Sequence, residues 1–310
     1  MLDYRKFFGS RKTRMIILSG LSWIPDKIIL NIQYFLQTGE KLHLKKPVKY
    51  TEYLQAYKLY YHNPEMKGWV DKVEARNLVK EKGLKDILVP EIAVYNNPDE
   101  IDFNNLPKKF VMKSSDGGGS NEVVVCRDIS KLDVNELKKT VSNWYKLPKS
   151  KKHIAREWAY ENDYPRRILV ERLLEDEKQR KDIDDFKFFC FNGKYKLLEW
   201  HKDRTTAHKA AHYDENLNYL PEFYTYDTMH TDNPLPANIK EMVKVAEKLA
   251  EGFPFVRVDL YNVGGKIYFG EMTFYPASGY FLYRPDSVNV WIGSLFKEID
   301  FEKYLQRKKN

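Results

Sequence analysis

The spacing of apolar residues divides the chain into a helical first part and a strand-rich remainder. Between residues 50 and 83 apolar side chains recur at helical spacing, and Gly83 is typical of a helix end. A second mostly helical stretch covers 128–161. Short runs rich in Val, Ile, Phe and Tyr, typical of strands, lie at 87–94, 110–113, 123–125, 167–175, 185–191 and 195–200. This pattern predicts an α+β fold.

The clearest pair of strands lies at 255–276, where two consecutive glycines mark a turn. Arg257 and Asp259 share one face of the first strand. Glu271 and Thr273 share one face of the second. Charged residues at these positions depart from the usual alternation of apolar with neutral polar residues, so this hairpin is the first candidate for a functional site.

The length of the turn decides whether Asp259 and Glu271 meet. A three-residue loop, 263–265, puts them on the same face, and a four-residue loop separates them. We predict the three-residue loop because Gly264-Gly265 supplies a residue at positive φ. Converging carboxylates repel one another unless a cation lies between them, and oxygen ligands combined with phosphates suit Mg²⁺. The alternative is an exposed hairpin whose acids are solvated.

A glycine-rich loop follows the strand that ends in Lys113. Residues 114–121 read SSDGGGSN and lead into another strand. Glycines let backbone N–H groups approach an anion closely, and a lysine adds charge directed at phosphate. The loop is neither a Walker loop nor a dinucleotide fingerprint, because no GK[ST] closes it and no helix opens after it. An ordinary hairpin tip is the alternative.

Polar residues recur on the later strands. Glu171 ends the apolar run ILVE, and Asp185 and Lys187 alternate onto one face of an aromatic strand that turns at Asn192-Gly193. Arg204 ends the returning strand. Ion pairs at the edge of a sheet would explain charged residues on one such strand. Because charged residues recur on several strands, we expect them to form a shared polar site.

The N-terminal segment is basic first and apolar afterwards. Five Lys and Arg residues between 5 and 14 precede an apolar run at 15–24, and a second run, 28–36, carries Asn31 and Gln33. Neither run reaches the roughly 20 apolar residues of a spanning helix. No small-residue cleavage site follows the first run. We expect two packed helices, and the alternative is a basic amphipathic helix on the inner leaflet of a membrane.

The composition of the chain excludes fewer classes of function than the motifs do. A chain of 310 residues supports two or three lobes, and its net charge of +8 suits anionic small molecules, nucleic acid or a membrane surface. The basic residues are scattered and no nucleic-acid motif is present, which argues against nucleic acid as a partner. Cys126 and Cys190 make no disulfide framework, so we expect a reducing, cytoplasmic compartment and two thiols in the core.

The sequence gives weak support for a zinc site or for a catalytic nucleophile on the protein. His208 and His212 are one helical turn apart and His201 is near in sequence, but no HExxH pattern accompanies them. We expect ordinary surface or substrate-pocket histidines. No serine lies in a nucleophile elbow, and neither cysteine has an activating neighbourhood.

Taken in order, these motifs resemble the ATP-grasp ligases, and within them the teichuronopeptide-biosynthesis (TupA-like) family. The resemblance extends over roughly residues 34–279. It is carried by WVDK at 69–72 with Arg76, LPKKFVMK at 106–113, ILVE at 168–171, DFKFFCFNG at 185–193, FPFVRVDLY at 253–261 and GEMTFYPASG at 270–279.

The resemblance implies an ATP-grasp fold in which two α+β lobes clasp ATP. The implied divisions are an N-terminal helical segment at 1–48, a pre-ATP-grasp region at 49–105, a first lobe with the glycine-rich lid at 106–182, and a second lobe with the metal site at 183–310.

The resemblance also implies the roles of individual residues. The implied ATP contacts are Lys72 and Lys113 at the phosphates, Ser120 in the lid, Glu171 at the adenine, Leu173 at the hinge, and Asp185 and Lys187 at the ribose and phosphates. The implied catalytic cations are Arg257, Arg204 and Lys187, and the implied Mg²⁺ ligands are Asp259, Glu271 and Thr273. Two features depart from the family pattern: the lid lacks the histidine of an NHGSG-like loop, and threonine replaces asparagine at 273.

The implied activity is that of an ATP-dependent carboxylate–amine ligase that uses ATP and Mg²⁺ and forms an acyl phosphate. Its implied substrates are an amino acid or another amine and a sugar carboxylate, such as a uronic acid of a bacterial capsular or cell-surface polysaccharide. The alternatives are a kinase that phosphorylates a sugar hydroxyl, and a non-catalytic polysaccharide-assembly protein. Peripheral association with the inner membrane or with assembly proteins is the alternative to a purely cytoplasmic location.

Overall fold

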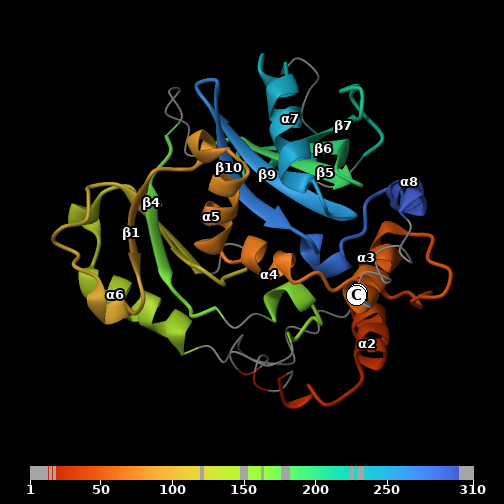
Figure 1. Ribbon diagram of the computed structural model, residues 1–310, viewed down its shortest axis with the longest axis horizontal. Helices are drawn as coiled ribbons and strands as arrows, with labels where there is room; N and C mark the ends of the chain where they lie inside the picture. The colour runs from red at the N-terminus through yellow and green to blue at the C-terminus, as the bar shows by residue number, and fades with distance from the viewer. Residues whose placement is uncertain are drawn as a thin grey trace.

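The protein combines two β-sheets with helices packed on their faces, which confirms the predicted α+β class (Figure 1). The computed structural model describes residues 13, 16, 19–118, 122–146, 153–161, 164–175, 182–223, 227–228 and 234–299.

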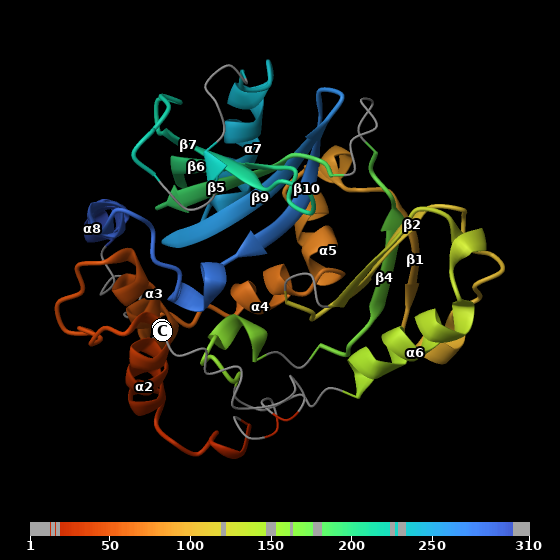
Figure 2. The ribbon, with the colours of Figure 1, turned by 180° about the vertical axis from the view of Figure 1, so that it is seen from behind.

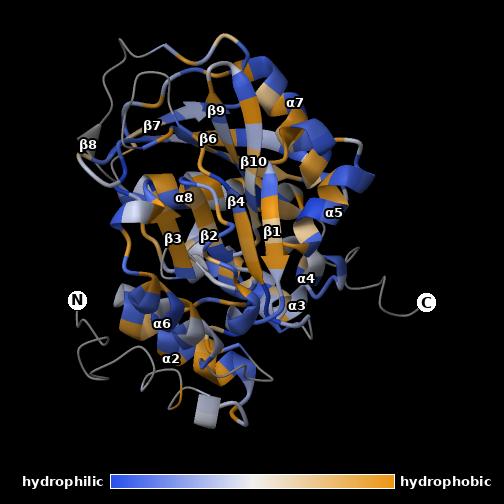
Figure 3. Ribbon diagram, turned by 90° about the vertical axis from the view of Figure 1, so that its left-hand side faces the viewer, coloured by the Kyte–Doolittle hydropathy of each residue, from blue (hydrophilic) through white to orange (hydrophobic). Residues whose placement is uncertain are grey.

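The smaller sheet has four antiparallel strands in the order β1-β4-β2-β3. Their bounds are β1 (Glu91–Tyr95), β2 (Phe110–Ser114), β3 (Val123–Cys126) and β4 (Ile168–Arg172), and Figure 3 shows them side by side. Helix α6 (Val134–Tyr145) packs against this sheet and begins at Asp133, whose side chain accepts hydrogen bonds from two backbone N–H groups of the first turn. Phe110, Met112 and Val141 belong to a core that is separate from that of the larger sheet.

The larger sheet has six strands in the order β10-β9-β5-β6-β7-β8. Their bounds are β5 (Asp185–Phe191), β6 (Lys194–Lys202), β7 (Lys209–Asp214), β8 (Asp227–Thr228), β9 (Phe255–Val263) and β10 (Lys266–Thr273). All neighbours are antiparallel except β7 and β8. Helix α7 (Ile239–Ala250) covers one face of this sheet (Figure 2).

The other face of the larger sheet is apolar at one end and polar at the other. Along β5, Asp185 and Lys187 point to this face, followed by Phe189 and Phe191. Helices α3 (Tyr50–Tyr60) and α8 (Asp286–Leu295) lie over the aromatic end, where Tyr50 packs on Phe189 with ring centroids 6.2 Å apart. The polar half of the same face is therefore left for other contacts.

Two short helices lie between the sheets, α4 (Glu65–Val70) and α5 (Glu74–Glu81) (Figures 1 and 2). On α5, Ala75 and Val79 are buried in the core of the larger sheet, whereas the Arg76 guanidinium reaches Glu171 on the smaller one. The segment between α4 and α5 is fixed by Asp71, whose Oδ1 accepts from the backbone N–H groups of Val73 and Glu74 at the start of α5.

Several predicted bounds were wrong. The expected helical region 50–83 is three helices, because 61–64 and 71–73 interrupt it. The expected strand 87–94 begins only at Glu91, after a 3₁₀ turn. Within the expected helical stretch 128–161 the structure has α6 and two single turns. The 3₁₀ turns are η2 (Lys85–Ile87), η3 (Pro98–Glu100), η5 (Ile129–Lys131), η6 (Trp158–Tyr160), η7 (Pro276–Gly279) and η8 (Phe296–Glu298).

The N-terminal region contains α2 (Asp26–Thr38), which ends at Gly39 with φ of 77°. Leu30 and Tyr34 pack it against Ala56 of α3. None of the helices in the described ranges is both long and apolar enough to cross a bilayer. Cys126 and Cys190 are buried free thiols, as predicted.

Candidate active site

The turn between β9 and β10 is shorter than predicted. It holds two residues, Gly264 and Gly265, with φ of 58° and 80°, and Val263 pairs with Lys266. Two glycines at positive φ give the two-residue turn that suits the twist of a hairpin. The prediction of a three-residue loop was therefore wrong, and this turn by itself would set Asp259 and Glu271 out of register.

A β-bulge corrects the register. Gly270 is an extra residue on β10, and beyond it Glu271 pairs directly with Asp259. A side chain at Gly270 would have its Cβ 2.8 Å from the Asp259 carbonyl oxygen, so glycine is required there. The bulge thus places the two carboxylates on one face of neighbouring strands. This placement was predicted, but from a three-residue loop rather than from a bulge.

Two cations surround Asp259. Lys187 Nζ lies 2.5 Å from Asp259 Oδ2 and 2.7 Å from Asp185 Oδ2. Arg257 donates to both Asp259 oxygens at 2.7 Å. Burial lowers the pKa of Lys187, but Asp185 and Asp259 raise it by more, so it stays charged. This part of the sheet is a buried network of fixed positive and negative charge.

The network continues across the sheet as a row of paired residues. Register joins Glu271 to Asp259, Asp259 to Lys187, Lys187 to Glu199 and Glu199 to His212. The row crosses five strands, from β10 to β7. Its β6 position also depends on a bulge, because Lys196 is an extra residue that shifts Glu199 opposite Lys187.

Sequence reasoning did not single out Glu199. Its Oε1 accepts a hydrogen bond from Tyr283 Oη at 2.5 Å and lies 3.4 Å from His212 Nε2, and its Oε2 lies 3.4 Å from His201 Nε2. Burial works to raise the pKa of Glu199, but the bonds with His201 and His212 hold it well below its usual range. Asn289 of α8 fixes Tyr283 by bonding both its backbone N–H and its carbonyl.

None of the three histidines lies on a helix, and only His212 belongs to the row. His212 is on β7, an extended strand, so the helical spacing inferred from His208 was wrong. His201 Nδ1 lies 2.8 Å from His208 Nε2. Among the described residues no group of three or more His, Cys, Asp or Glu side chains could hold a metal ion.

The smaller sheet contributes Lys113 and Glu171. Lys113 Nζ donates to Glu171 Oε2 at 2.7 Å, and Arg76 Nη1 donates to Glu171 Oε1 at 2.6 Å. Both carboxylate oxygens of Glu171 are therefore engaged by cations, and its adenine contact stays a prediction. Leu173 is half-buried directly after β4, and Ser120 lies outside the described residues.

Lys72 lies between α4 and α5, at the base of the glycine-rich loop. Its backbone N–H donates to Ser115 O at 2.8 Å, and its Nζ donates to Gly117 O. Burial lowers the pKa of Lys72; Glu271 opposes the shift and Lys113 adds to it. A lysine in this position gains from a bound phosphate, which would supply the missing negative charge.

Asp185 lies beside the row, two residues before Lys187 on β5, and Arg204 reaches it from the segment after β6. Arg204 is half-exposed and donates to Asp185 Oδ2 at 2.8 Å. The other oxygen, Asp185 Oδ1, is buried without a hydrogen-bond partner in the described part of the chain. An unused buried acceptor is costly, so this atom fits a ligand hydroxyl or an ordered water.

These residues fit a magnesium-bound nucleotide. Glu271 is half-exposed, and Thr273 Oγ1 lies 3.5 Å from its Oε1. Together with Asp259 they form an oxygen-only set, and Mg²⁺ with substrate phosphates needs only one or two carboxylates. Lys72, Lys113 and Lys187 supply charge for the phosphates. The predicted residues within the described ranges form two groups. The group on the larger sheet comprises Lys187, Arg204, Arg257, Asp185, Asp259, Glu271 and Thr273, and the group across from it comprises Lys72, Lys113 and Glu171.

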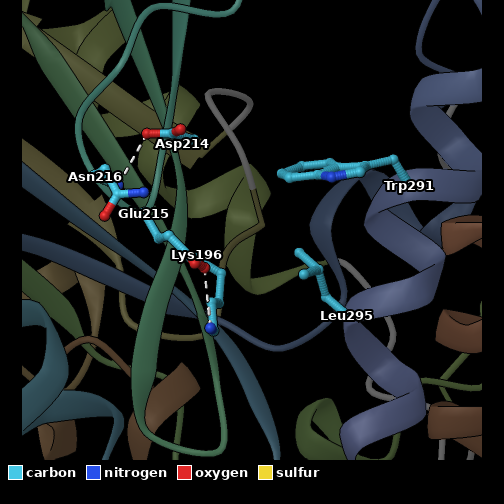
Figure 4. Close-up of a pocket in the computed structure, with 6 residues that line it drawn as sticks. All are labelled: Lys196, Asp214, Glu215, Asn216, Trp291 and Leu295. Atoms are coloured by element: carbon cyan, nitrogen blue, oxygen red, sulfur yellow. Dashed lines mark hydrogen bonds and ion pairs between the residues drawn. The ribbon is translucent and has the colours of Figure 1, made fainter.

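A separate depression of about 340 Å³ lies between the β6–β7 edge and α8. Figure 4 shows Trp291 and Leu295 of α8 on one side and Lys196 and Asp214 on the other. None of the predicted site residues lines it, and Lys196 and Asp214 are engaged by Glu215 and by the backbone of the β7 turn. We assign it no role in the nucleotide site.

Comparisons with known proteins identify the family of the chain. The profile of the TupA-like ATP-grasp family matches residues 52–297. No curated protein matches the chain. Similar solved structures include D-alanine–D-alanine ligase from Bacillus anthracis complexed with ATP, 16% identical over 97% of this chain and 95% of that chain with a TM-score of 0.47.

Two further structures are more distant. They are N5-carboxyaminoimidazole synthetase from Staphylococcus aureus complexed with ADP, 13% identical over 69% of this chain and 47% of that chain with a TM-score of 0.43, and the ATP-grasp ligase PsnB with Mg and ADP, 12% identical over 79% and 61% with a TM-score of 0.40. Since the family profile covers most of the chain, the chain belongs to the TupA-like ATP-grasp family.

Proposed function

We propose that this protein is an ATP-dependent carboxylate–amine ligase that forms an amide bond through an acyl phosphate and releases ADP and phosphate. The observation that carries the proposal is the pairing of Asp259 with Glu271 beside Lys187 and Arg257, with Lys72 and Lys113 opposite. This arrangement suits stabilisation of charge on a transferring phosphoryl group and needs no covalent nucleophile on the protein.

Each group has a role that follows from its position. Lys72 and Lys113 bind the phosphates of ATP. The glycine-rich loop that follows β2 is the proposed lid, which would exclude water from the acyl phosphate. Asp259, Glu271 and Thr273 would hold Mg²⁺, which supplies charge that offsets the negative phosphate oxygens.

The remaining cations face the substrate carboxylate. The carboxylate oxygen attacks the γ-phosphate, ADP leaves, and the amine then attacks the activated carbonyl and displaces phosphate. Arg257 is partly buried and fixed by Asp259, and its pKa is raised by that carboxylate against the effect of burial. A cation held this firmly is preorganised to stabilise the oxyanion that forms at the carbonyl carbon.

For substrates we propose an amino acid and the carboxylate of a uronic acid in a cell-surface polysaccharide. This part rests on the resemblance to teichuronopeptide biosynthesis. A kinase acting on a sugar hydroxyl is the second candidate, because the same cations would stabilise either phosphoryl transfer.

The two candidates differ in the fate of the phosphate. With Mg-ATP and hydroxylamine in place of the amine, the ligase converts glucuronic or galacturonic acid to a hydroxamate as ADP forms. With a carboxylate labelled with ¹⁸O and an amino acid as the amine, one labelled oxygen appears in the released phosphate. A stable phosphosugar with no label transfer would establish the kinase instead.

A matched pair of variants separates this activity from contaminating ATPases. Glu271→Gln removes a proposed metal ligand, whereas Glu251→Gln changes a 69% exposed acid at the end of α7. Hydroxamate formation should be lost in the first variant and kept in the second. Equal formation by both variants would contradict the proposed site.

A further inference from the structure

Helix α2 presents an apolar face to solvent. The exposed side chains are Trp23 at 79%, Phe35 at 59%, Ile28 at 51%, Ile32 at 50% and Leu36 at 41%, and we call these five the α2 apolar face. The four on the helix recur at i, i+4, i+7 and i+8, so they lie on one side. Within the described residues, half of the exposed large apolar side chains fall between 16 and 36. Such clustering marks an interaction site rather than scattered surface residues.

The opposite side of α2 is fixed to the body of the protein. Leu30 and Tyr34 are fully buried, and Tyr34 Oη lies 2.9 Å from Thr51 Oγ1. Gln33 donates to Ile154 O at 2.8 Å and accepts from Tyr280 Oη at 3.0 Å. The helix therefore cannot rotate to bury its apolar face without breaking these contacts.

The described residues beside this face are mainly basic. Residues 19–46 contain four lysines against the two acids Asp26 and Glu40. Exposed lysines flank the helix at 27, 41, 45 and 46. The nearby acids Asp26 and Glu40 are paired with Arg156 and Lys49 of the protein itself. A second copy of the chain would bring like charges together, whereas an anionic surface would neutralise them.

We propose that the α2 apolar face docks onto a bilayer containing anionic phospholipids, with α2 lying flat in the interface. An amphipathic helix with a tryptophan at its edge and lysines around it has the features of such a surface anchor. The lysines would contact the phospholipid headgroups, and the apolar side chains would enter the boundary with the acyl chains. The inference does not depend on the proposed enzymatic activity.

Docking would also hold the candidate active site near the membrane. Tyr280, which bonds Gln33 of α2, directly follows η7, the turn after β10. The anchoring helix thus contacts the segment that follows the strand carrying Glu271. A substrate carried on a lipid would meet the site without diffusing through the cytoplasm.

Sedimentation of the full chain with vesicles tests the proposal. We expect binding to vesicles of phosphatidylcholine with phosphatidylglycerol, weaker binding to phosphatidylcholine alone, and a decrease as salt is added. The double variant Ile32→Ser/Phe35→Ser should bind about tenfold or more weakly. The control Ile92→Ser/Val125→Ser also removes two exposed apolar side chains, 37% and 49% exposed on β1 and β3, and should bind as the unsubstituted chain does.

Two outcomes would overturn the proposal. One is that the unsubstituted chain does not sediment with either kind of vesicle. The other is that Ile32→Ser/Phe35→Ser sediments as strongly as the unsubstituted chain. Circular dichroism checks that both double variants are folded, and light scattering reports their mass. Self-association that disappears in Ile32→Ser/Phe35→Ser, without vesicle binding by the unsubstituted chain, would identify the face as an interface between copies instead.

Discussion

Asp259 and Glu271 face each other across β9 and β10, but their surroundings differ. Asp259 is 2% exposed and holds Lys187 and Arg257. Its removal would leave the Arg257 guanidinium without its bidentate partner and Lys187 with Asp185 alone, at a cost of about 3 kcal/mol. Glu271 is half-exposed and lies 3.7 Å from Arg257 Nη2. Glu271 is therefore the residue at which activity can be separated from stability.

We expect Glu271→Gln to lower ATP turnover at least about 100-fold, because an amide is a poorer Mg²⁺ ligand and carries no charge. The free energy of unfolding should change by less than about 1 kcal/mol, since the exposed pair with Arg257 contributes little. ADP release and urea unfolding measure the two effects. Unchanged turnover would remove Glu271 from the metal site.

Lys58 is a buried cation outside the proposed nucleotide site. Its Nζ donates to Ser278 O at 2.7 Å and lies 3.8 Å from Glu157. Burial lowers its pKa from 10.5 to about 8, although Glu157 opposes the shift. Between these values the unfolded chain binds a proton that the folded chain does not, so the contribution of Lys58 to stability rises with pH.

Lys58→Met should remove this dependence. The free energy of unfolding of the unsubstituted chain should rise relative to the variant by about 3 kcal/mol from below pH 8 to above pH 10.5. Urea unfolding of both proteins across that range measures the difference, and groups common to both cancel. A constant difference would show that Lys58 titrates at its ordinary pKa.

At the scale of elements, two hairpins of the larger sheet share one design. Each has a two-residue turn with both residues at positive φ, Asn192-Gly193 and Gly264-Gly265, and each has one bulge, at Lys196 or Gly270. Without the bulges, these turns would leave the acids on β6 and β10 one residue out of register with Lys187 and Asp259. The bulges therefore determine the row of paired charges.

Substitutions at two glycines of the β9–β10 hairpin distinguish the effect of the bulge on the site from the effect of backbone strain on stability. Gly270→Ala would force a Cβ to within 2.8 Å of Asp259 O and displace Glu271, so ATP turnover should fall at least about tenfold. Gly265→Ala meets no atom within 4 Å and should cost only about 1 kcal/mol of stability, from its φ of 80°. Turnover and urea unfolding of both variants check this. Equal turnover in the two would contradict the role of the bulge.

The bulges also mark what the sequence could and could not predict. Alternation identified Asp185 with Lys187 and Arg257 with Asp259 as residues of one face, because side chains in a strand have a period of two. A three-residue loop was predicted to place Asp259 and Glu271 on the same face. In the structure a two-residue loop together with a β-bulge places them there. Glu199 was missed because regular pairing of β5 with β6 from the Asn192-Gly193 turn, without a bulge, would set Leu198 opposite Lys187.

Contacts between distant segments were beyond the sequence patterns as well. Arg76 belongs to a helix whose apolar neighbours predict burial on one side, but nothing local indicates that it reaches Glu171. Trp23 and Phe35 read as core residues of packed helices, and the structure leaves both exposed. Tertiary packing decides which apolar residues are covered, and a single sequence does not contain that information directly.

At the scale of the whole molecule, polar contacts join two lobes that have separate cores. The contacts include Arg167 Nη2 to Asp71 Oδ1 at 2.9 Å, Arg76 to Glu171, and the backbone of Lys72 to Ser115. Polar interfaces of this kind favour relative movement of the lobes. Since the candidate phosphate cations come from both lobes, a nucleotide bound between them should hold the lobes together and stabilise the whole chain.

Mg-ATP should therefore raise the midpoint of thermal unfolding. A ligand at about 100 times its Kd stabilises a protein by about 2.7 kcal/mol, which for a chain of this size corresponds to roughly 5 °C. A non-hydrolysable ATP analogue with Mg²⁺ measures the shift in the absence of turnover. Glu271→Gln should show a smaller shift with Mg²⁺ and the same shift as the unsubstituted chain without it, whereas Glu251→Gln should behave as the unsubstituted chain in both. No shift in the unsubstituted chain would mean that the two sheets do not hold a nucleotide between them.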